Sequence, residues 1–263
     1  MASTKKFSVR KFRKFSSPEE MLAYAHETLP CLGKGSSRTA FAYSRGKVLK
    51  ISADNKGFAQ NAAERFVANN LDTKMAVSAI YDHKEIDGHT VWLISQIVRV
   101  IKNYDEFENL AGFSWEPFNE IIREFAKHNA QESLGKVTTS ISNEYSKRVK
   151  KLKTSGDERN ANYFEKLLKD IEVMKVSPFF LGIIAAMEQN RLMPGDILEV
   201  EHYGKTSDGN IVLLDYGLTE EIANKYYKKP AIKSCTVAVT TVSLASSPEI
   251  KTVVKKKRSA AAR

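Results

Sequence analysis

The stretch that decides the fold is residues 210–217, which read Asn210-Ile211-Val212-Leu213-Leu214-Asp215-Tyr216-Gly217. A run of four apolar residues predicts a short buried β-strand, and the acidic residue stands where that strand meets a loop. The strand holds Asp215 in place, and the loop leaves its carboxylate open. Because carboxylate oxygens are the ligands that Mg²⁺ prefers in proteins, we predict that Asp215 binds a metal ion.

Segments upstream of Asp215 carry residues of the kind that bind nucleotides. A turn containing two glycines is followed by an apolar strand with Lys50, then by a helical segment with Glu64, and later by Gly195-Asp196. In this order, the segments resemble the nucleotide-binding frame of the protein kinase-like superfamily. The Asp-Tyr-Gly element and the short chain are similar to the compact kinase-like proteins that tailed bacteriophages encode.

This resemblance implies a fold, an activity and two cofactors. The implied fold class is α+β, a bilobal protein kinase-like fold with a β-rich N-lobe and a mostly helical C-lobe. The C-lobe is expected to be reduced, because 46 residues follow Gly217. The implied activity is ATP- and Mg²⁺-dependent transfer of the γ-phosphate to a hydroxyl acceptor, either a protein or a small molecule.

The glycine turn is the expected phosphate-binding element. Gly33 and Gly35 let the backbone approach phosphate oxygens, and Ser36 and Ser37 add hydroxyl and N–H donors. In kinase-like loops a third glycine often completes the pattern, and Arg38 stands at that position here. Arg38 is a cation that can contact a phosphate. The alternative interpretation is a simple glycine turn between two strands.

Lys50 is the expected partner of the α- and β-phosphates. Alternation along its strand places the side chain on the face opposite to its apolar neighbours, which is the cleft face in the resemblance. The resemblance also implies a helix glutamate that orients this lysine, for which Glu64 is the best candidate. Glu85 and Asp54 compete for this pairing, and an exposed edge-strand lysine is the alternative interpretation of Lys50.

Asp196 is the candidate catalytic base, and the sequence around it departs from the kinase pattern. Kinases place an Asn five residues later as a second metal ligand, whereas this chain has Glu201 followed by His202. Glu201 can ligate Mg²⁺ as a hard oxygen donor, and His202 is a poor ligand for that ion. This departure leaves open a pseudokinase that keeps the frame without turnover.

The formal charge of +10 lies in the two ends of the chain. Residues 1–14 and 251–263 each carry six Lys or Arg and no acid, and the remaining 29 basic residues face 31 acidic ones. Such tails are typical of disordered arms that make weak nucleic-acid contacts. The alternative function is therefore an inactive pseudokinase or a virion-associated binding or scaffold protein with basic tails. An unrelated α+β protein is a third possibility.

Composition indicates a globular protein without a membrane partner. The longest apolar run, residues 178–187, is too short to span a bilayer, and the N-terminus lacks the apolar core of a secretory signal. Cys31 and Cys235 offer no disulfide framework or zinc spacing, which favours a reducing compartment. We expect a cytoplasmic location, in the host cytoplasm or in the virion if the source is viral.

The hydrophobic pattern and the turn residues predict the order of elements. Strands are expected at 39–43, 47–51, 75–81 and 89–96, helices at 17–26, 58–70 and 178–190, mostly helix over 104–176, and a hairpin turn at 207–210. These elements divide the chain into four parts. The parts are a basic arm and leading helix (1–29), the N-lobe (30–101), the reduced C-lobe (102–228) and a basic tail (229–263).

Overall fold

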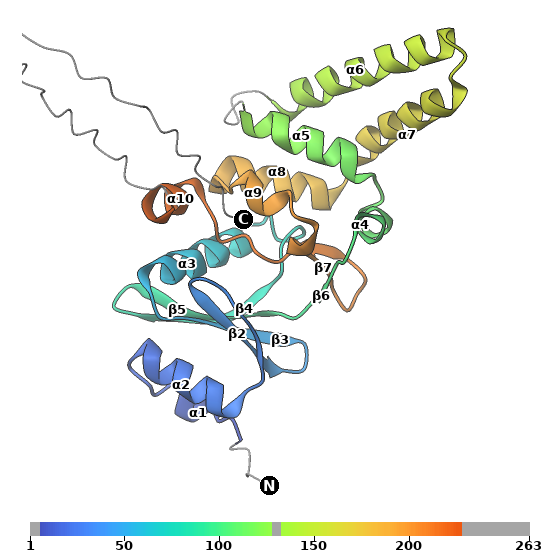
Figure 1. The fold of residues 1–263 in the computed structure, drawn as a ribbon. Helices are drawn as coiled ribbons and strands as arrows, with labels where there is room; N and C mark the ends of the chain where they lie inside the picture. Colours follow the sequence, from blue (N-terminus) through green and yellow to red (C-terminus); the bar gives the residue numbers. More distant parts are fainter. Residues whose placement is uncertain (1–5, 128–132, 228–263) are drawn as a thin grey trace, which may run out of the picture. The chain divides into compact units, whose positions relative to one another are not determined.

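The structure, a computed structural model, describes residues 6–127 and 133–227, all within one compact unit. The predicted basic tail at 229–263 and residues 1–5 of the predicted arm lie outside the described residues. Two helices lead into an antiparallel sheet, and a mostly helical region follows (Figure 1). This mixed architecture confirms the predicted α+β class and is consistent with a bilobal kinase-like fold.

The N-terminal sheet has five antiparallel strands in the order β1-β2-β3-β5-β4. The strands are β1 (Cys31–Lys34), β2 (Arg38–Ser44), β3 (Lys47–Ser52), β4 (Ile80–Ile86) and β5 (His89–Gln96). Helix α3 (Asn55–Asn69) is inserted between β3 and β4. The strands predicted at 39–43, 47–51 and 89–96 and the helix predicted at 58–70 are confirmed.

The two faces of this sheet have different partners. On one face, Leu49 and Ile51 are buried in a core that they share with α1 (Val9–Phe12) and α2 (Pro18–Thr28). Ser17 caps α2 as predicted, because its side chain accepts a hydrogen bond from Glu20 N. Helix α3 lies on the opposite side of the sheet from α1 and α2 (Figure 1). Lys50 alternates with Leu49 and Ile51 and therefore faces α3.

Part of the predicted basic arm packs on the sheet. Arg13 is ion-paired with Asp82 of β4, and Lys11 Nζ lies 4.8 Å from the centre of the Tyr24 ring. Phe12 is 2% exposed and belongs to the same core as α2. The leading helices therefore complete the core of the sheet.

The helical region has its own core, which is rich in aromatic side chains. Its helices are α4 (Tyr104–Ala111), α5 (Trp115–Lys127), α6 (Leu134–Thr154), α7 (Glu158–Met174), α8 (Pro178–Asn190), α9 (Pro194–Ile197), the 3₁₀ turn η1 (Val200–His202) and α10 (Glu220–Tyr226). Ser177 caps α8, whose bounds match the helix predicted at 178–190. Within the described residues, the expectation of helix over 104–176 is confirmed.

A small second sheet carries the strand that precedes Asp215. It consists of β6 (Arg99–Val100), β7 (Tyr203–Lys205) and β8 (Ile211–Leu213) in that order. The predicted hairpin turn joins β7 to β8, and Gly209 adopts a φ of +87° there.

The strand predicted at 75–81 is wrong in its bounds. Residues 76–78 do not join the first sheet, because Val77 bridges Leu213 and Ser78 N donates to Leu213 O. The observed strand β4 begins at Ile80, so residues 76–78 connect the N-terminal region to β8.

Among the described residues, no helix is long and apolar enough to cross a membrane. Cys31 is exposed and free, and Cys235 lies outside the described residues.

Gly57 marks a close approach between α3 and the glycine turn. A Cβ added at Gly57 would collide with Ser52 Oγ and with the backbone carbonyl oxygen of Ser37. Neither neighbour is the free end of a long side chain. The absence of a side chain at Gly57 therefore lets α3 begin directly against the turn.

We expect Gly57→Ala to destabilise the protein by about 1–3 kcal/mol, as for overpacking of a filled site. At a helix position with free space, the exchange of Gly for Ala stabilises the protein by up to about 1 kcal/mol. Destabilisation by Gly57→Ala would therefore indicate the close approach. Gly135→Ala in α6 is the matched control, because a Cβ there has its nearest neighbour 3.9 Å away. Urea unfolding of both variants measures the difference, and equal stabilities would contradict the close approach.

Candidate functional site

Four charged side chains from distant parts of the sequence meet beside α3. We call Arg38, Lys50, Glu64 and Asp215 the charge cluster. Lys50 Nζ lies 2.8 Å from Glu64 Oε2, and Arg38 Nη1 lies 2.5 Å from Glu64 Oε1. The other guanidinium nitrogen, Arg38 Nη2, lies 2.9 Å from Asp215 Oδ1. The structure thus brings together three residues that the sequence predicted for this site and adds Arg38.

Burial differs strongly within the charge cluster. The side chain of Glu64 is 0% exposed, Arg38 is 12% and Lys50 is 17% exposed, whereas Asp215 is 47% exposed. A carboxylate without solvent needs cations or hydrogen-bond donors around it, and Glu64 has two cations. Asp215 is the open end of the cluster, as expected for a residue that meets a ligand.

The alternative partners predicted for Lys50 have other roles. Glu85 is ion-paired with Arg65, and Asp54 caps α3 by accepting a hydrogen bond from Gly57 N at 2.7 Å. Lys50 Nζ also donates to the carbonyl oxygen of Leu214 at 3.2 Å. The lysine therefore lies between α3 and the residue before Asp215.

The Asp-Tyr-Gly element is held in place by its second and third residues. Tyr216 is fully buried, and its hydroxyl donates to the carbonyl oxygen of Ser78 at 2.5 Å. Gly217 lies against α3, where an added Cβ would be 3.0 Å from Gln60 O and 3.1 Å from Gln60 Cβ. The glycine therefore permits the loop to run close to the helix that carries Glu64.

Hydrogen bonds close the base of the glycine turn. Gly35 N donates to Arg38 O at 2.8 Å, and Ser52 Oγ donates to Ser37 O at 2.9 Å. Ser36 Oγ accepts a hydrogen bond from Lys56 Nζ at 2.8 Å. Around Gly33, no heavy atom beyond its chain neighbours lies within 4 Å of an added Cβ. A side chain at Gly33 would therefore meet no neighbour.

Gln60 links the glycine turn to the end of α10. Its Oε1 accepts a hydrogen bond from Ser37 Oγ, and its Nε2 donates to the Tyr227 hydroxyl at 3.3 Å. Lys56 Nζ lies 4.4 Å from the centre of the Tyr227 ring. The first two turns of α3 thus contact both the turn and Tyr227.

Asp196 lies in α9 and interacts electrostatically with the charge cluster. Burial, together with the negative charge of Asp215, raises the pKa of Asp196 to about 7. His202 partly offsets this rise, and its Nδ1 lies 2.8 Å from the backbone oxygen of Asp196. A carboxyl group of this kind takes up and releases protons near neutral pH.

Asp215 has the opposite electrostatic balance. Burial acts to raise its pKa, but the positive charges of Arg38 and Lys50 outweigh burial and hold the pKa below its usual range. The carboxylate of Asp215 is therefore ionised at neutral pH. The two acids differ because the cations lie beside Asp215.

The donor set suits Mg²⁺ with a bound phosphate. Mg²⁺ keeps several waters and takes one or two carboxylates plus substrate phosphates, and Asp215 can supply a carboxylate. Glu201 is exposed in η1. Among the described residues, no three or more His, Cys, Asp or Glu side chains gather closely enough to hold a metal ion by themselves. The metal role of Glu201 stays a prediction.

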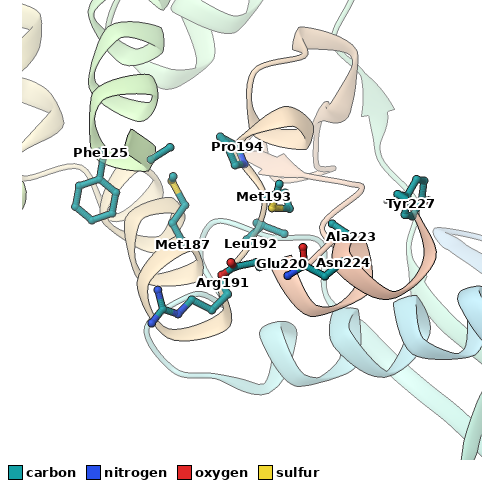
Figure 2. Close-up of a pocket in the computed structure, with 11 residues that line it drawn as sticks. Phe125, Met187, Arg191, Leu192, Met193, Pro194, Glu220, Ala223, Asn224 and Tyr227 are labelled. Atoms are coloured by element: carbon teal, nitrogen blue, oxygen red, sulfur yellow. The ribbon is translucent and has the colours of Figure 1, made fainter. Parts of the chain in front are cut away.

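A mostly apolar cavity of about 450 Å³ lies beside α9. Figure 2 shows its lining from α5, α8, α9 and α10, with Phe125, Met187, Pro194, Ala223 and Tyr227 among the labelled residues. Pro194 lines the cavity and stands two residues before Asp196. Helix α9 thus connects the cavity to the carboxyl group of Asp196.

The contacts of Arg38 are what sequence reasoning missed. The register of β2 with β3 pairs Ala40 with Lys50 and Arg38 with Ser52. Paired residues of antiparallel strands point to the same face, so Arg38 shares the face of Lys50. The register shifts by one residue between Ala42 and Ser44, so a register deduced from the turn at 44–46 alone would not have placed Arg38 on this face.

No protein-family model and no curated protein matches this sequence, whereas 30 chains of solved structures do. One of them is the streptomycin-ATP-APH(2")-IIa ternary complex, with 13% sequence identity and a TM-score of 0.30. The match covers 72% of this chain and 65% of the other, so this chain spans less than two thirds of that protein. A likeness of this size says nothing about activity here, and the function is argued from the charge cluster itself.

The raised pKa of Asp196 predicts a specific pH dependence of stability. Between about pH 4 and the folded pKa of about 7, the folded protein holds a proton that the unfolded chain has released, so stability falls as the pH rises through this window. We expect Asp196→Asn to raise the melting temperature at pH 8, with a difference from wild type that shrinks towards pH 5.

Melting curves from pH 5 to pH 8 check this expectation. Asp208→Asn in the exposed hairpin turn is the matched control, because it removes one carboxylate without touching the cluster. A melting-temperature difference between wild type and Asp196→Asn that is constant with pH would show that Asp196 is not a buried acid.

Proposed function

We propose that this protein is a kinase-like phosphotransferase that uses ATP with Mg²⁺ and phosphorylates a hydroxyl acceptor. The observation that carries the proposal is the 2.8 Å pair between Lys50 and Glu64, with Asp215 joined to the same cluster through Arg38. A strand lysine oriented by a buried helix glutamate and followed by an open metal-binding aspartate is an arrangement suited to a nucleoside triphosphate.

Each residue of the cluster has a role that agrees with its surroundings. ATP with Mg²⁺ supplies the phosphoryl group and neutralises the charge that develops during its transfer. Glu64 holds the ammonium of Lys50 in one direction, so that Lys50 can contact phosphate oxygens. The turn at Gly33 and Gly35 would let phosphate oxygens approach the backbone, and the ionised carboxylate of Asp215 would hold the ion.

Asp196 is the proposed base. A base works best when its pKa lies near the working pH, and burial brings the pKa of Asp196 to about 7. Its carboxylate would accept the proton of the acceptor hydroxyl. The interaction with His202 lowers the pKa of Asp196 and so favours the ionised form that this role requires.

The acceptor would approach through the cavity that Pro194 lines. Its walls are mostly apolar, with Arg191 and Glu220 as charged groups, so we propose an acceptor with an apolar body that presents a hydroxyl towards α9. A protein side chain, a small molecule and a residue of this chain all satisfy that description.

A nucleotide-binding protein without phosphotransfer is the second candidate. The specific observation in its favour is Glu201, which stands where a kinase has its second metal-binding Asn and is exposed to solvent. Such a pseudokinase would bind nucleotide through the same cluster and act as a scaffold. The contacts with nucleic acid predicted for this alternative fall largely on tails outside the described residues.

We expect Mg²⁺ and ATP together to raise the melting temperature, because a ligand that binds only the folded state stabilises it. At a ligand concentration of about 100 Kd the gain is about 2.7 kcal/mol. Lys50→Ala and Asp215→Asn should both lose the shift, the first by removing the phosphate contact and the second by removing the metal ligand.

Lys47→Ala is the matched control for this titration. Lys47 lies on the same strand, but its ammonium lies over the Tyr81 ring at 4.7 Å and not in the cluster. Wild type and Lys47→Ala should shift alike. An absent shift in wild type at millimolar nucleotide would reject the nucleotide site, and an unchanged shift in Asp215→Asn would reject the metal role of Asp215.

Phosphotransfer separates the two candidate functions. With radiolabelled ATP we expect wild type to label itself or a hydroxyl acceptor, and Asp196→Asn to lower the rate by roughly 10²–10⁴-fold, the usual contribution of a catalytic base. Nucleotide affinity of the variant should stay close to wild type, because Asp196 acts on the acceptor. Wild-type nucleotide binding without any transfer would favour the pseudokinase.

A further inference from the structure

Arg38 occupies a position where a kinase-like turn has a glycine, and its guanidinium points into the charge cluster. Its two terminal nitrogens contact different acids, Glu64 at 2.5 Å and Asp215 at 2.9 Å. The side chain is 12% exposed, so these contacts replace most of its hydration. The proposed function accounts for Lys50, Glu64 and Asp215 but gives Arg38 no role.

The charges show why Arg38 matters to Asp215. Glu64 is already paired with Lys50, so Arg38 is a second cation for that acid. Asp215 is ion-paired with Arg38 in the described part of the chain. A divalent cation that approaches Asp215 in the absence of nucleotide therefore meets the guanidinium of Arg38 beside the carboxylate. The two positive charges repel each other, and the repulsion is stronger where water is partly excluded.

A triphosphate changes this balance. It brings several negative charges to the turn that begins at Gly33, and Arg38 forms the end of that turn through the bond from Gly35 N to its carbonyl oxygen. A guanidinium can donate two parallel hydrogen bonds to phosphate oxygens. Nη2 of Arg38 therefore binds a phosphate oxygen in preference to Asp215 once phosphate is present. The contact from Nη1 to Glu64 can stay in place during this exchange.

We propose that Arg38 is a phosphate-binding residue that occupies Asp215 when nucleotide is absent and thereby excludes free divalent cations. Metal then enters with the nucleotide, when Arg38 turns from Asp215 to a phosphate. This inference rests on the proposed function, because it takes Asp215 as the metal ligand and the glycine turn as the phosphate site.

The test measures Mn²⁺ binding to the nucleotide-free full-length protein by electron paramagnetic resonance. Arg38→Gln removes the charge and keeps hydrogen-bonding capacity, and we expect it to bind Mn²⁺ about tenfold more tightly than wild type, as expected when a charge repulsion at a partly exposed site is removed. Arg65→Gln is the matched control, because Arg65 is next to Glu64 on α3 but pairs with Glu85. It should bind Mn²⁺ as wild type does.

A second arm measures ATP binding in the presence of EDTA. Without metal, Arg38→Gln should bind ATP about tenfold more weakly, since a charge-assisted contact to phosphate is lost. The opposite directions of the two effects distinguish this proposal from general damage to the site, which would weaken both ligands.

Arg38→Lys keeps the test decisive if Arg38→Gln does not fold. A lysine retains the charge next to Glu64 but cannot contact two acids through separate nitrogens, so Mn²⁺ affinity should lie between those of wild type and Arg38→Gln. Mn²⁺ binding no tighter than wild type in every folded Arg38 variant would overturn the proposal. If wild type binds no Mg²⁺-ATP, the proposed function fails, and the Mn²⁺ comparison still decides whether Arg38 excludes the free ion.

Discussion

Burial of the Glu64 carboxylate is the constraint on which the rest of the site depends. An ionised carboxylate without solvent is costly unless cations lie beside it, and the chain places two of them at 2.5 Å and 2.8 Å. One comes from the end of the glycine turn and one from β3, while Glu64 itself comes from α3. Neutralising the charge of Glu64 thus brings the glycine turn, β3 and α3 together, and Arg38 extends the same network of ion pairs to Asp215.

The pairing of Lys50 with Glu64 could be predicted from the sequence because simple periodicities decide it. Alternation in β3 separates Lys50 from Leu49 and Ile51, and a helix inserted after that strand must cover the face that Lys50 occupies. The contacts of Arg38 could not be predicted in the same way. They depend on the register of β2 and on the path of a long side chain, neither of which a local pattern determines.

The error at residues 75–81 has a physical cause as well. The run is apolar because Ala76 and Val77 are buried between α8 and β8, where Gly182 leaves room for the Ala76 side chain. The true strand β4 lies at the edge of the sheet and is polar on its exposed side, so its hydrophobic signal is weak. The packing of α1 and α2 on the sheet was missed because it joins segments far apart in the chain.

Gln60 connects three separate parts of the molecule. Gln60 contacts the glycine turn through Ser37 and the Asp-Tyr-Gly element through Gly217, and its amide nitrogen donates to Tyr227, which lines the apolar cavity. A side chain bonded on both sides in this way ties the glycine turn to the wall of the cavity, so a substitution at Gln60 removes contacts at both places at once.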